Sequence, residues 1–464
     1  MNRSTYVIII FMNSLELKQI AACTRGDAGE VELRGSVTGV SIDSKKVKKG
    51  DLFIAVKGEK YDGHNFVTEA LKICSAALVE KNISASVSKP LIRVNSTKTA
   101  LQEIAAFWRT KINPRVVAVT GSNGKTTTKD MLEHILKKSL RVVAAEKSFN
   151  NFIGVPLTVL EAGRKTEVLI TEMETNVIGG IRTLCMISQP HIGIITNVSD
   201  THLADLKTKE NVFREKNELA AGLADGGTLI INADDKYAKK FQPRKGAAKL
   251  TYSIKNESDF RAEMLEENLS GSVFKIKGAI FKLKIPGRFN VLNAAAASCA
   301  AMSLGIPLDV SAKRIFSFKP QSGRMEIKKI GGSILINDSF NANPGSSKSL
   351  CGVISREKGA KILVFADMLE LGDAAEALHT LTGERFARAG VQKIFYTGKY
   401  GHLFISGAKK VNAKITAKIY EDKKTMFEDI KKEADGIFIF KGSRKMNIDE
   451  VYENVVQYLS SRNR

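Results

Sequence analysis

Residues 116–128 could bind a nucleoside triphosphate, because an apolar run leads into a glycine-containing turn and then into Lys125 and Thr126. A strand that enters such a turn and then a helix directs backbone N–H groups and the helix dipole toward phosphate oxygens. Lys125 would reach the β- and γ-phosphates, and the Thr126 hydroxyl would ligate Mg²⁺. The predicted phosphate loop comprises Thr120, Gly121, Ser122, Asn123, Gly124, Lys125, Thr126 and Thr127.

This loop is a shortened variant of the common phosphate-binding pattern. Val119 stands where that pattern has a glycine, ahead of the Gly-Lys pair. The alternative interpretation is that residues 121–124 form an ordinary turn between a strand and a helix. The strand-like run before the turn and the amphipathic stretch 130–136 after it favour phosphate binding.

Two further groups follow strand-like runs. Residues 168–171 lead into Glu172, and Glu174 comes next but one. Hard cations prefer oxygen ligands, so a carboxylate at the end of a buried strand is suited to hold a metal ion opposite the phosphate loop. His202 follows the run 192–196, although a lone histidine is more often structural than catalytic.

The pattern of apolar runs indicates how these groups are positioned. After a region up to about residue 114 that mixes short apolar runs with turn signals, strand-like and helical stretches alternate, which implies parallel strands with crossover helices. A hairpin-like pair, 272–277 and 280–285, interrupts the alternation, which restarts at 333–336. Several later runs end in polar or glycine-containing segments, where parallel sheets place ligand crevices.

We therefore predict an α/β protein of three domains. Residues 1–112 would form a small α/β N-terminal domain, and residues 113–321 a central phosphate-loop ATPase domain with a parallel sheet. Residues 322–464 would form a C-terminal dinucleotide-fold-like domain that closes on the nucleotide.

Composition narrows the class of protein and of partner. The net charge is +22, but the lysines are spread along the chain and aromatic content is only 7%. This distribution favours a solvated surface that helps to steer polyanionic nucleotides, rather than a surface that binds nucleic acid. Five scattered cysteines without a Cys-x-x-Cys pair argue against a disulfide framework or zinc site and favour a reducing cytoplasm. The apolar run 6–12 is shorter than the ~20 residues of a membrane span, and residues 1–11 could be a mis-start or a disordered tag.

The shortened Thr-Gly-x-x-Gly-Lys-Thr-Thr form, with motifs in order along nearly the whole chain, resembles the Mur ligases and the related folylpolyglutamate synthetases. In that family ATP phosphorylates a substrate carboxylate, and an amine attacks the acyl phosphate to give an amide, ADP and phosphate. The resemblance implies an ATP-dependent acid–amino-acid ligase that uses ATP and two Mg²⁺ ions.

The resemblance also assigns roles in the central region. Asn150 and Asn151 resemble the asparagine loop near the γ-phosphate, although an Asn-rich turn before a helix is the alternative. The match selects Glu172 over Glu174 and makes His202 a metal-site residue. Residues 213–218 resemble an Ala-Lys-x-Glu element whose lysine carries a carbamate, whereas a helix-surface lysine is the alternative for Lys216. The implied catalytic residues are Lys125, Glu172, His202 and carbamylated Lys216, and the implied metal ligands are Thr126, Glu172, His202 and Lys216.

Further matches concern the rest of the nucleotide. Residues 287–293 resemble the Gly-x-His-Asn-x-x-Asn motif, with Asn290 and Asn293 in place, the second of which helps to read adenine, and Phe289 at the usual His position. Arg324 resembles the arginine that reaches ATP across the domain boundary. Asp338 resembles the aspartate that grips the ribose, with Phe340 replacing a commoner Tyr.

The C-terminal motifs resemble the members that add D-alanyl-D-alanine. Residues 341–344 read Asn-Ala-Asn-Pro, and segments 365–372 and 441–444 match the same subgroup, whereas the Asp-Asn-Pro-Arg motif of the meso-diaminopimelate-adding enzyme is not found. Acidic groups at a strand end suit an ammonium group, and Lys with Arg suits a carboxylate. The candidates for the dipeptide are Asn341, Asn343, Asp367, Glu370, Lys441 and Arg444.

Residues 40–58 and 61–64 resemble the UDP-sugar-peptide-binding domain of this subgroup, which folylpolyglutamate synthetases lack. The polar candidates for this substrate are Ser41, Asp43, Ser44, Lys57 and His64. The expected enzyme is a monomeric cytoplasmic ligase that joins D-alanyl-D-alanine to UDP-MurNAc-tripeptide in peptidoglycan synthesis. The rivals are another Mur-type or folylpolyglutamate-type ligase and, from a different class, a phosphate-loop NTPase module for nucleic acid.

Overall fold

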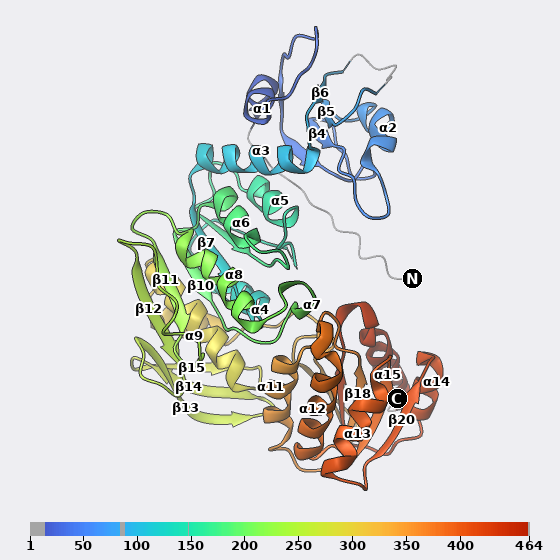
Figure 1. Cartoon of the computed structure of the whole chain (residues 1–464). Coiled ribbons are helices and arrows are strands. Elements are labelled where there is room, and N and C mark those ends of the chain that lie inside the picture. The colour runs from blue at the N-terminus through green and yellow to red at the C-terminus, as the bar shows by residue number, and fades with distance from the viewer. Residues whose placement is uncertain (1–13, 84–88, 147, 463–464) are drawn as a thin grey trace.

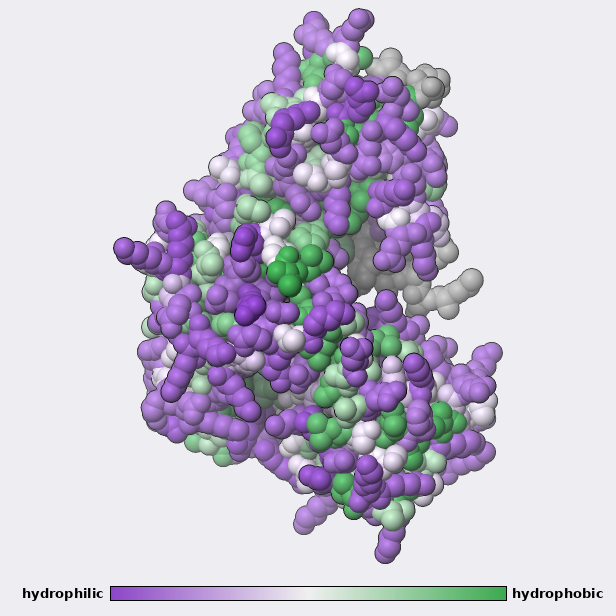
Figure 2. Space-filling model, in the orientation of Figure 1, coloured by the Kyte–Doolittle hydropathy of each residue, from purple (hydrophilic) through white to green (hydrophobic). Residues whose placement is uncertain are grey.

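The computed structural model describes residues 14–83, 89–146 and 148–462, and its strands form three larger sheets that correspond to the three expected domains (Figure 1). The proposals for residues 1–11 lie outside the described ranges. No helix within those ranges is both long and apolar enough to cross a membrane. The face shown in Figure 2 is mainly hydrophilic, with hydrophobic residues in small groups.

The N-terminal part is built on a parallel sheet with the strand order β3-β4-β5-β6. Its last helix, α3, lies between this sheet and the central domain in Figure 1. The buried Trp108 of α3 donates its indole N–H to the carbonyl oxygen of Ala162 at 2.7 Å, which anchors the helix to the central domain. The elements are β1 (Leu15–Glu16), α1 (Leu17–Thr24), β2 (Ser36–Val37), β3 (Gly39–Ser41), β4 (Asp51–Ile54), η1 (Gly63–Phe66), α2 (Val67–Leu71), β5 (Ala76–Val79), β6 (Leu91–Arg93) and α3 (Thr97–Ile112).

The central sheet has the order β15-β14-β13-β12-β11-β10-β7-β9-β8. It is parallel from β8 to β13, and the expected hairpin appears as the antiparallel pair β14 and β15. The elements are β7 (Arg115–Thr120), α4 (Lys125–Leu136), β8 (Val142–Ala144), α5 (Gly154–Glu161), β9 (Val168–Glu172), α6 (Gly180–Ser188), β10 (Ile192–Ile195), α7 (Leu203–Leu206), α8 (Lys209–Ala221), β11 (Thr228–Asn232), β12 (Ala248–Ser253), β13 (Phe260–Asn268), β14 (Gly271–Ile276), β15 (Ala279–Leu283), α9 (Arg288–Ser303) and α10 (Leu308–Ile315).

Strand register brings three loops to one edge of the central sheet. β7 lies between β9 and β10, with Val119 opposite Glu172 and Thr120 opposite Ile195. Because the three strands are parallel, their carboxyl ends are level, and the loops that follow them meet. The phosphate loop, the segment after Glu172 and the segment that reaches His202 are therefore neighbours.

The C-terminal sheet has the order β16-β17-β21-β18-β19-β20 and is parallel except for β16. This arrangement fits the expected dinucleotide-fold-like domain. Its elements are β16 (Glu326–Ile330), β17 (Ser333–Asn337), α11 (Pro344–Ile354), β18 (Lys361–Ala366), η2 (Gly372–Ala374), α12 (Ala375–Arg388), β19 (Lys393–Thr397), α13 (Gly401–Val411), β20 (Thr416–Tyr420), α14 (Lys423–Ile430), β21 (Ile437–Lys441), η3 (Arg444–Met446) and α15 (Ile448–Arg462).

Helices α12 and α13 approach each other so closely that we expect Gly407→Ala to destabilise the protein. A Cβ added at Gly407 would collide with the backbone of Thr380 in α12. Because backbone atoms cannot move aside as a flexible side chain can, overpacking should cost about 1–3 kcal/mol of unfolding free energy. Thermal unfolding measures the effect. Gly352→Ala in α11 is the control, since the added Cβ has no described atom within 4 Å other than its chain neighbours and the backbone of its own helix, and a loss of stability there equal to that of Gly407→Ala would contradict the argument.

Candidate functional site

A cavity of about 780 Å³ lies between the central and C-terminal domains. Its lining comes from the loops after β7, β9 and β10, from the start of α9, and from C-terminal segments around β17, α11 and β21. Among the sequence-predicted residues, those that line it are Ser122, Asn123, Gly124, Lys125, Thr126, Thr127, Asn150, Glu172, His202, Asn290, Asn293, Arg324, Asp338, Asn341, Asn343, Glu370, Lys441 and Arg444.

The phosphate loop has the predicted form of a tight turn at the start of α4. Gly121 and Gly124 have φ angles of +143° and +83°, where a Cβ would be strained. An added Cβ would also collide with the Thr196 hydroxyl at Gly121 and with the Asn293 amide at Gly124. Thr120 turns away from the cavity and donates its hydroxyl to the carbonyl oxygen of Met173 at 2.8 Å.

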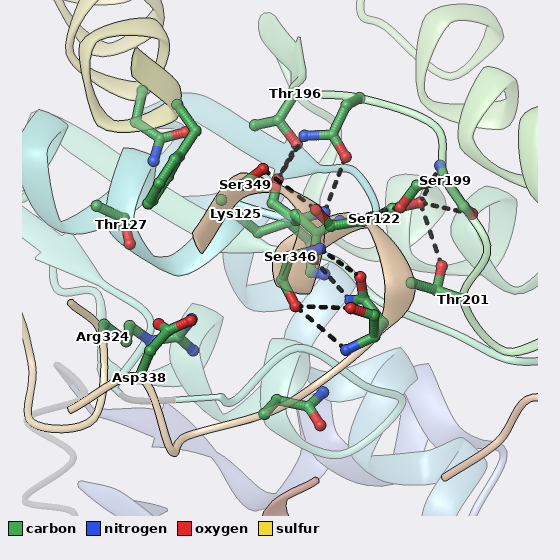
Figure 3. A pocket seen from close by; sticks show the side chains of 18 of the residues that line it. Ser122, Lys125, Thr127, Thr196, Ser199, Thr201, Arg324, Asp338, Ser346 and Ser349 are labelled. Carbon is green, nitrogen blue, oxygen red and sulfur yellow. Dashed lines mark hydrogen bonds between the residues drawn. The ribbon is translucent and has the colours of Figure 1, made fainter. Parts of the chain in front are cut away.

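A second loop, after β10, holds the phosphate loop in shape. The Ser122 hydroxyl accepts from the backbone N–H of Ser199 at 2.8 Å and from the Thr201 hydroxyl at 3.1 Å. The Asn123 side-chain amide donates to the Ser199 hydroxyl at 2.9 Å. Figure 3 shows these bonds beside Lys125, with Ser346 of α11 facing the same loop. The turn is thus fixed by side chains from a neighbouring strand end.

Two carboxylates converge near Lys125. The Lys125 ammonium donates to the Gly121 carbonyl oxygen at 2.8 Å and pairs with Glu174 Oε1 at 2.6 Å. The Asn150 side-chain amide donates to Glu172 Oε1 at 2.9 Å and to Glu174 Oε2 at 3.1 Å. Burial opposes ionisation of Glu174, but Lys125 and His202 hold the pKa of its carboxyl well below the usual range.

Glu174 is therefore the residue that sequence reasoning passed over. It lines the cavity together with Glu172, and it contacts the phosphate-loop lysine directly. The signal was present, because a second carboxylate two residues beyond the end of a strand stays within reach of the same sheet edge. The family match favoured Glu172 alone.

His202 bridges the two domains. Its Nε2 lies 3.2 Å from Glu174 Oε1, and its Nδ1 lies 2.8 Å from Oε2 of Glu370 in the C-terminal domain. Burial disfavours the charged imidazole, but hydrogen bonds to both carboxylates raise the pKa of His202 to about 9. Because both ring nitrogens are engaged in these ion pairs, His202 is not placed as a free metal ligand here.

Lys216 lies on α8 and is buried, but it is not among the described residues that line the cavity. The helix-surface interpretation of this lysine is therefore wrong. Burial lowers the pKa of Lys216 to about 8, and the nearby charge of Lys125 acts in the same direction. The predicted carbamate on Lys216 is not supported, and Lys216 is an unmodified lysine.

Asn290 and Asn293 lie in the first turns of α9, beside the phosphate loop. Asn293 Oδ1 accepts from the Thr128 hydroxyl at 3.3 Å, and the Asn293 amide donates to Asn290 Oδ1, also at 3.3 Å. Asn290 in turn donates to the Pro286 carbonyl oxygen at 2.8 Å. Phe289, at the usual His position, lines the cavity with them.

Asn151 does not reach the site. Its side-chain oxygen accepts from the backbone N–H groups of Ile153 at 3.0 Å and Gly154 at 2.9 Å, which closes the turn before α5. Of the two predicted asparagines, only Asn150 faces the cavity; the turn interpretation was correct for Asn151.

Arg324 crosses from the C-terminal domain to the phosphate loop. It donates to the Thr126 hydroxyl at 3.0 Å, and its guanidinium lies 3.9 Å from the centre of the Phe340 ring. Stacking of this kind keeps a long cationic side chain in one orientation. In Figure 3, Arg324 and Asp338 lie together near Thr127.

Two other predicted residues hold the C-terminal side of the cavity together. The buried Lys441 ammonium pairs with Asp338 Oδ2 at 2.5 Å and donates to the Asn341 carbonyl oxygen at 3.1 Å. Asn343 caps α11 by accepting from Ser346 N at 2.8 Å, and its amide donates to Asn123 Oδ1 at 2.7 Å. Lys441 therefore positions the 338–341 segment and is not free for a substrate carboxylate.

Three more residues predicted to bind the dipeptide, Asp367, Glu370 and Arg444, have different surroundings in the structure. Asp367 is buried outside the cavity lining, and its carboxylate accepts from the Tyr396 hydroxyl at 2.7 Å and from the backbone N–H of Lys399 at 2.7 Å, so the structure does not bring it to the cavity. Glu370 faces the cavity but pairs with His202. Arg444 lines the cavity and is half exposed, with Asp449 as partner at 2.9 Å.

The N-terminal candidates lie in another domain and not in this cavity. Ser41 and Asp43 close a turn, in which Asp43 N donates to the Ser41 hydroxyl at 3.2 Å, and Ser44 follows in the same turn. Lys57 is exposed beside the Asp62 backbone.

His64 is buried, with Nδ1 2.6 Å from Asp62 Oδ1 and Nε2 accepting from Glu80 N at 2.9 Å. Both ring nitrogens of His64 are thus used within the fold, and its role in substrate binding stays a prediction.

The cavity offers a partial site for magnesium. Within residues 14–83, 89–146 and 148–462, no group of three or more His, Cys, Asp or Glu side chains is arranged to hold a metal ion. Magnesium, however, takes few protein ligands and completes its shell with water and phosphate oxygens. Glu172 Oε2 is buried without a hydrogen-bond partner among the described residues, and an orphaned carboxylate oxygen of this kind fits a cation ligand.

Comparison with known proteins places the chain among enzymes. Three family models match it: the Mur ligase family catalytic domain at residues 36–109, the Mur ligase middle domain at 119–301, and the Mur ligase glutamate ligase domain at 323–444. The UDP-N-acetylmuramoyl-tripeptide–D-alanyl-D-alanine ligase of Bacillus subtilis is 34% identical over 454 residues, which cover 95% of this chain and 98% of that protein. The Escherichia coli enzyme of the same name is 31% identical over 451 residues, with 95% and 98% covered.

Solved structures agree with this placement. MurF from Acinetobacter baumannii superposes with a TM-score of 0.89 at 26% identity, over 97% of this chain and 100% of that chain. The MurF ligase from Thermotoga maritima in complex with ADP gives a TM-score of 0.80 at 26% identity, over 91% and 98% of the two chains.

Proposed function

Because the chain belongs to the Mur ligase family, we propose that the cavity between its central and C-terminal domains is where it uses ATP to join D-alanyl-D-alanine to UDP-N-acetylmuramoyl-tripeptide. The reaction is the formation of an amide bond at the expense of ATP, in the synthesis of peptidoglycan. One observation carries the proposal: a single cavity joins the phosphate loop and Glu172 of the central domain to Arg324 and Asp338 of the C-terminal domain.

The nucleotide would lie along the boundary between these two domains. The N–H groups of residues 121–126 and the Lys125 ammonium would bind its phosphates, since they meet at the start of α4. Asn290 and Asn293 would face the adenine, and Asp338, fixed by Lys441, would accept from the ribose hydroxyls. Arg324 would reach the phosphates from the opposite wall.

Magnesium would be held by the Thr126 hydroxyl and by the free oxygen of Glu172, as a first site, with water and phosphate oxygens completing its shell. When bound, magnesium would offset the negative charge that develops on the transferred phosphoryl group. A second ion is part of the proposal; it would be held mainly by phosphate oxygens and water, because both oxygens of Glu174 already have protein partners. Asn150 would keep both carboxylates oriented toward the cavity.

Each domain would have its own part in the reaction. We assign residues 1–112 to binding of the UDP-sugar peptide, 113–321 to ATP and phosphoryl transfer, and 322–464 to closure and delivery of the dipeptide. The peptide carboxylate would be activated as an acyl phosphate, and the dipeptide amine would displace phosphate from it. Exclusion of water by the docked C-terminal domain would protect that acyl phosphate from hydrolysis. The monomeric state is part of the proposal, and so is a cytoplasmic location, which the five free thiols favour.

The test is ADP release by the purified protein with ATP, Mg²⁺ and UDP-N-acetylmuramoyl-tripeptide, measured with and without D-alanyl-D-alanine. We expect ADP release to depend on the dipeptide and to match, mole for mole, a sugar-peptide product that has gained both alanines, measured by mass spectrometry. Equal stimulation by glutamate or meso-diaminopimelate would assign the chain to another ligase of the family. ADP release that ignores every amine would contradict the proposed function.

A further inference from the structure

Four charged side chains form a continuous chain of ion pairs from the phosphate loop to the C-terminal domain, and we call it the Lys125–Glu370 chain. Lys125 Nζ lies 2.6 Å from Glu174 Oε1, and the same oxygen lies 3.2 Å from His202 Nε2. His202 Nδ1 then lies 2.8 Å from Glu370 Oε2. Glu174 is the central member, because one of its oxygens serves both cations.

The geometry at Lys125 gives Glu174 a directing role. An ammonium group has three donors, of which one goes to the Gly121 carbonyl oxygen and one to Glu174. These two bonds fix the direction of the third donor, which remains for a phosphate oxygen. The Asn150 amide donates to Glu174 Oε2 at 3.1 Å and so fixes the Glu174 carboxylate. The carboxylate that orients Lys125 is therefore itself held in place.

The domain junction in this chain is built from strained backbone. His202 and Glu370 have φ angles of 53° and 65°, a left-handed conformation that non-glycine residues rarely adopt. Such conformations persist only where the surroundings enforce them, and they cluster at functional sites. Here the ion pair and a hydrogen bond from Ala204 N to the Glu370 carbonyl oxygen, at 3.1 Å, hold the two loops together.

From this arrangement we propose that Glu174 is a positioning residue that, through His202 and Glu370, makes the alignment of Lys125 depend on docking of the C-terminal domain. The inference rests on the proposed function, since it concerns the same phosphoryl transfer. With the domain docked, Glu370 holds His202, His202 shares the Glu174 carboxylate, and Lys125 points into the cavity. With the domain undocked, Glu370 leaves His202, and the ion pairs that orient Lys125 rearrange.

A double-mutant cycle tests this, because Glu174 and Glu370 contact His202 and not each other among the recorded ion pairs of the described residues. The variants are Glu174→Gln, Glu370→Gln and the two combined, assayed for kcat and for the KM of ATP and of the dipeptide. We expect each single change to lower kcat about 10-fold. The kcat of the double variant should be within about 3-fold of that of the weaker single variant, because either single change already interrupts the Lys125–Glu370 chain. Small-angle scattering should show a larger radius of gyration for Glu370→Gln than for the wild type.

The matched control is Asp373→Asn, which removes an exposed carboxylate three residues after Glu370, in the short helix η2. Asp373→Asn should leave kcat and the scattering curve unchanged. Combined with Glu174→Gln, it should cause no further loss of kcat. Fully multiplicative losses in the Glu174–Glu370 pair would overturn the proposal, as would a Glu370→Gln effect confined to the KM of the dipeptide. Wild-type activity with the dipeptide supports the proposed function whichever way the cycle turns out, so the two failures are distinguishable.

Discussion

Replacing Lys125 by methionine is expected to lower dipeptide-dependent ADP release by about 10²- to 10³-fold or more, because in the proposed reaction this buried cation stabilises the transferred phosphoryl group mainly in the transition state. The KM for ATP should change much less than kcat. A coupled assay of ADP release at saturating substrates measures the loss.

A control must separate this loss from damage to the fold, because Lys125→Met leaves the Glu174 carboxylate without one of its cations. The double variant Lys125→Met with Glu174→Gln removes that unpaired charge and should regain thermal stability while remaining inactive. Lys138→Met, at an exposed position just beyond the end of α4, should keep the rate within about twofold of wild type, as surface substitutions away from the site have small effects. Substantial activity in the folded Lys125 variants would remove this lysine from the mechanism.

Glu172→Gln is expected to lower kcat by about 10²-fold, since charge stabilisation by a metal ion is worth several kcal/mol of barrier. The substitution keeps an oxygen to accept from the Asn150 amide but removes the negative charge on the orphaned Oε2. The Mg²⁺ concentration needed for half-maximal rate should rise accordingly. Titration of the rate with Mg²⁺ measures both effects.

Glu167→Gln serves as the comparison, because Glu167 lies just before the same strand but pairs with Arg141 away from the cavity. Its rate and Mg²⁺ dependence should match the wild type. An unchanged Mg²⁺ dependence in Glu172→Gln would contradict the assignment of Glu172 as a magnesium ligand.

The phosphate loop and the order of the elements could be predicted because they depend on short stretches of chain. An apolar run, two glycines and a lysine before an amphipathic stretch specify a strand, a turn and a helix locally, and residues 115–136 have that form. Parallel strands also imply that Glu172 and the segment before His202 end at the same sheet edge as the loop, and the register of β7, β9 and β10 confirms this.

Which polar side chains point into the cavity could not be predicted in the same way. Asp367, His64 and Asn151 are residue types that could bind a substrate. In the structure, however, their polar side-chain atoms form hydrogen bonds within their own domains. Buried polar groups must find partners wherever packing places them, as Asp367 does with Tyr396 and His64 with Glu80, whereas the exposed Asn151 bonds to its own turn. Motif matching assigned these residues by position alone.

The amino-acid sequence by itself determined the family, the three-domain α/β architecture and the phosphate loop, because local patterns and matched motifs suffice for these. Only the tertiary structure decided that Glu174 pairs with Lys125 and that His202 meets Glu370 across the domain boundary. The physical reason is that an ion pair depends on distances of a few ångströms between groups far apart in the chain, and only the packing of one domain against another sets those distances.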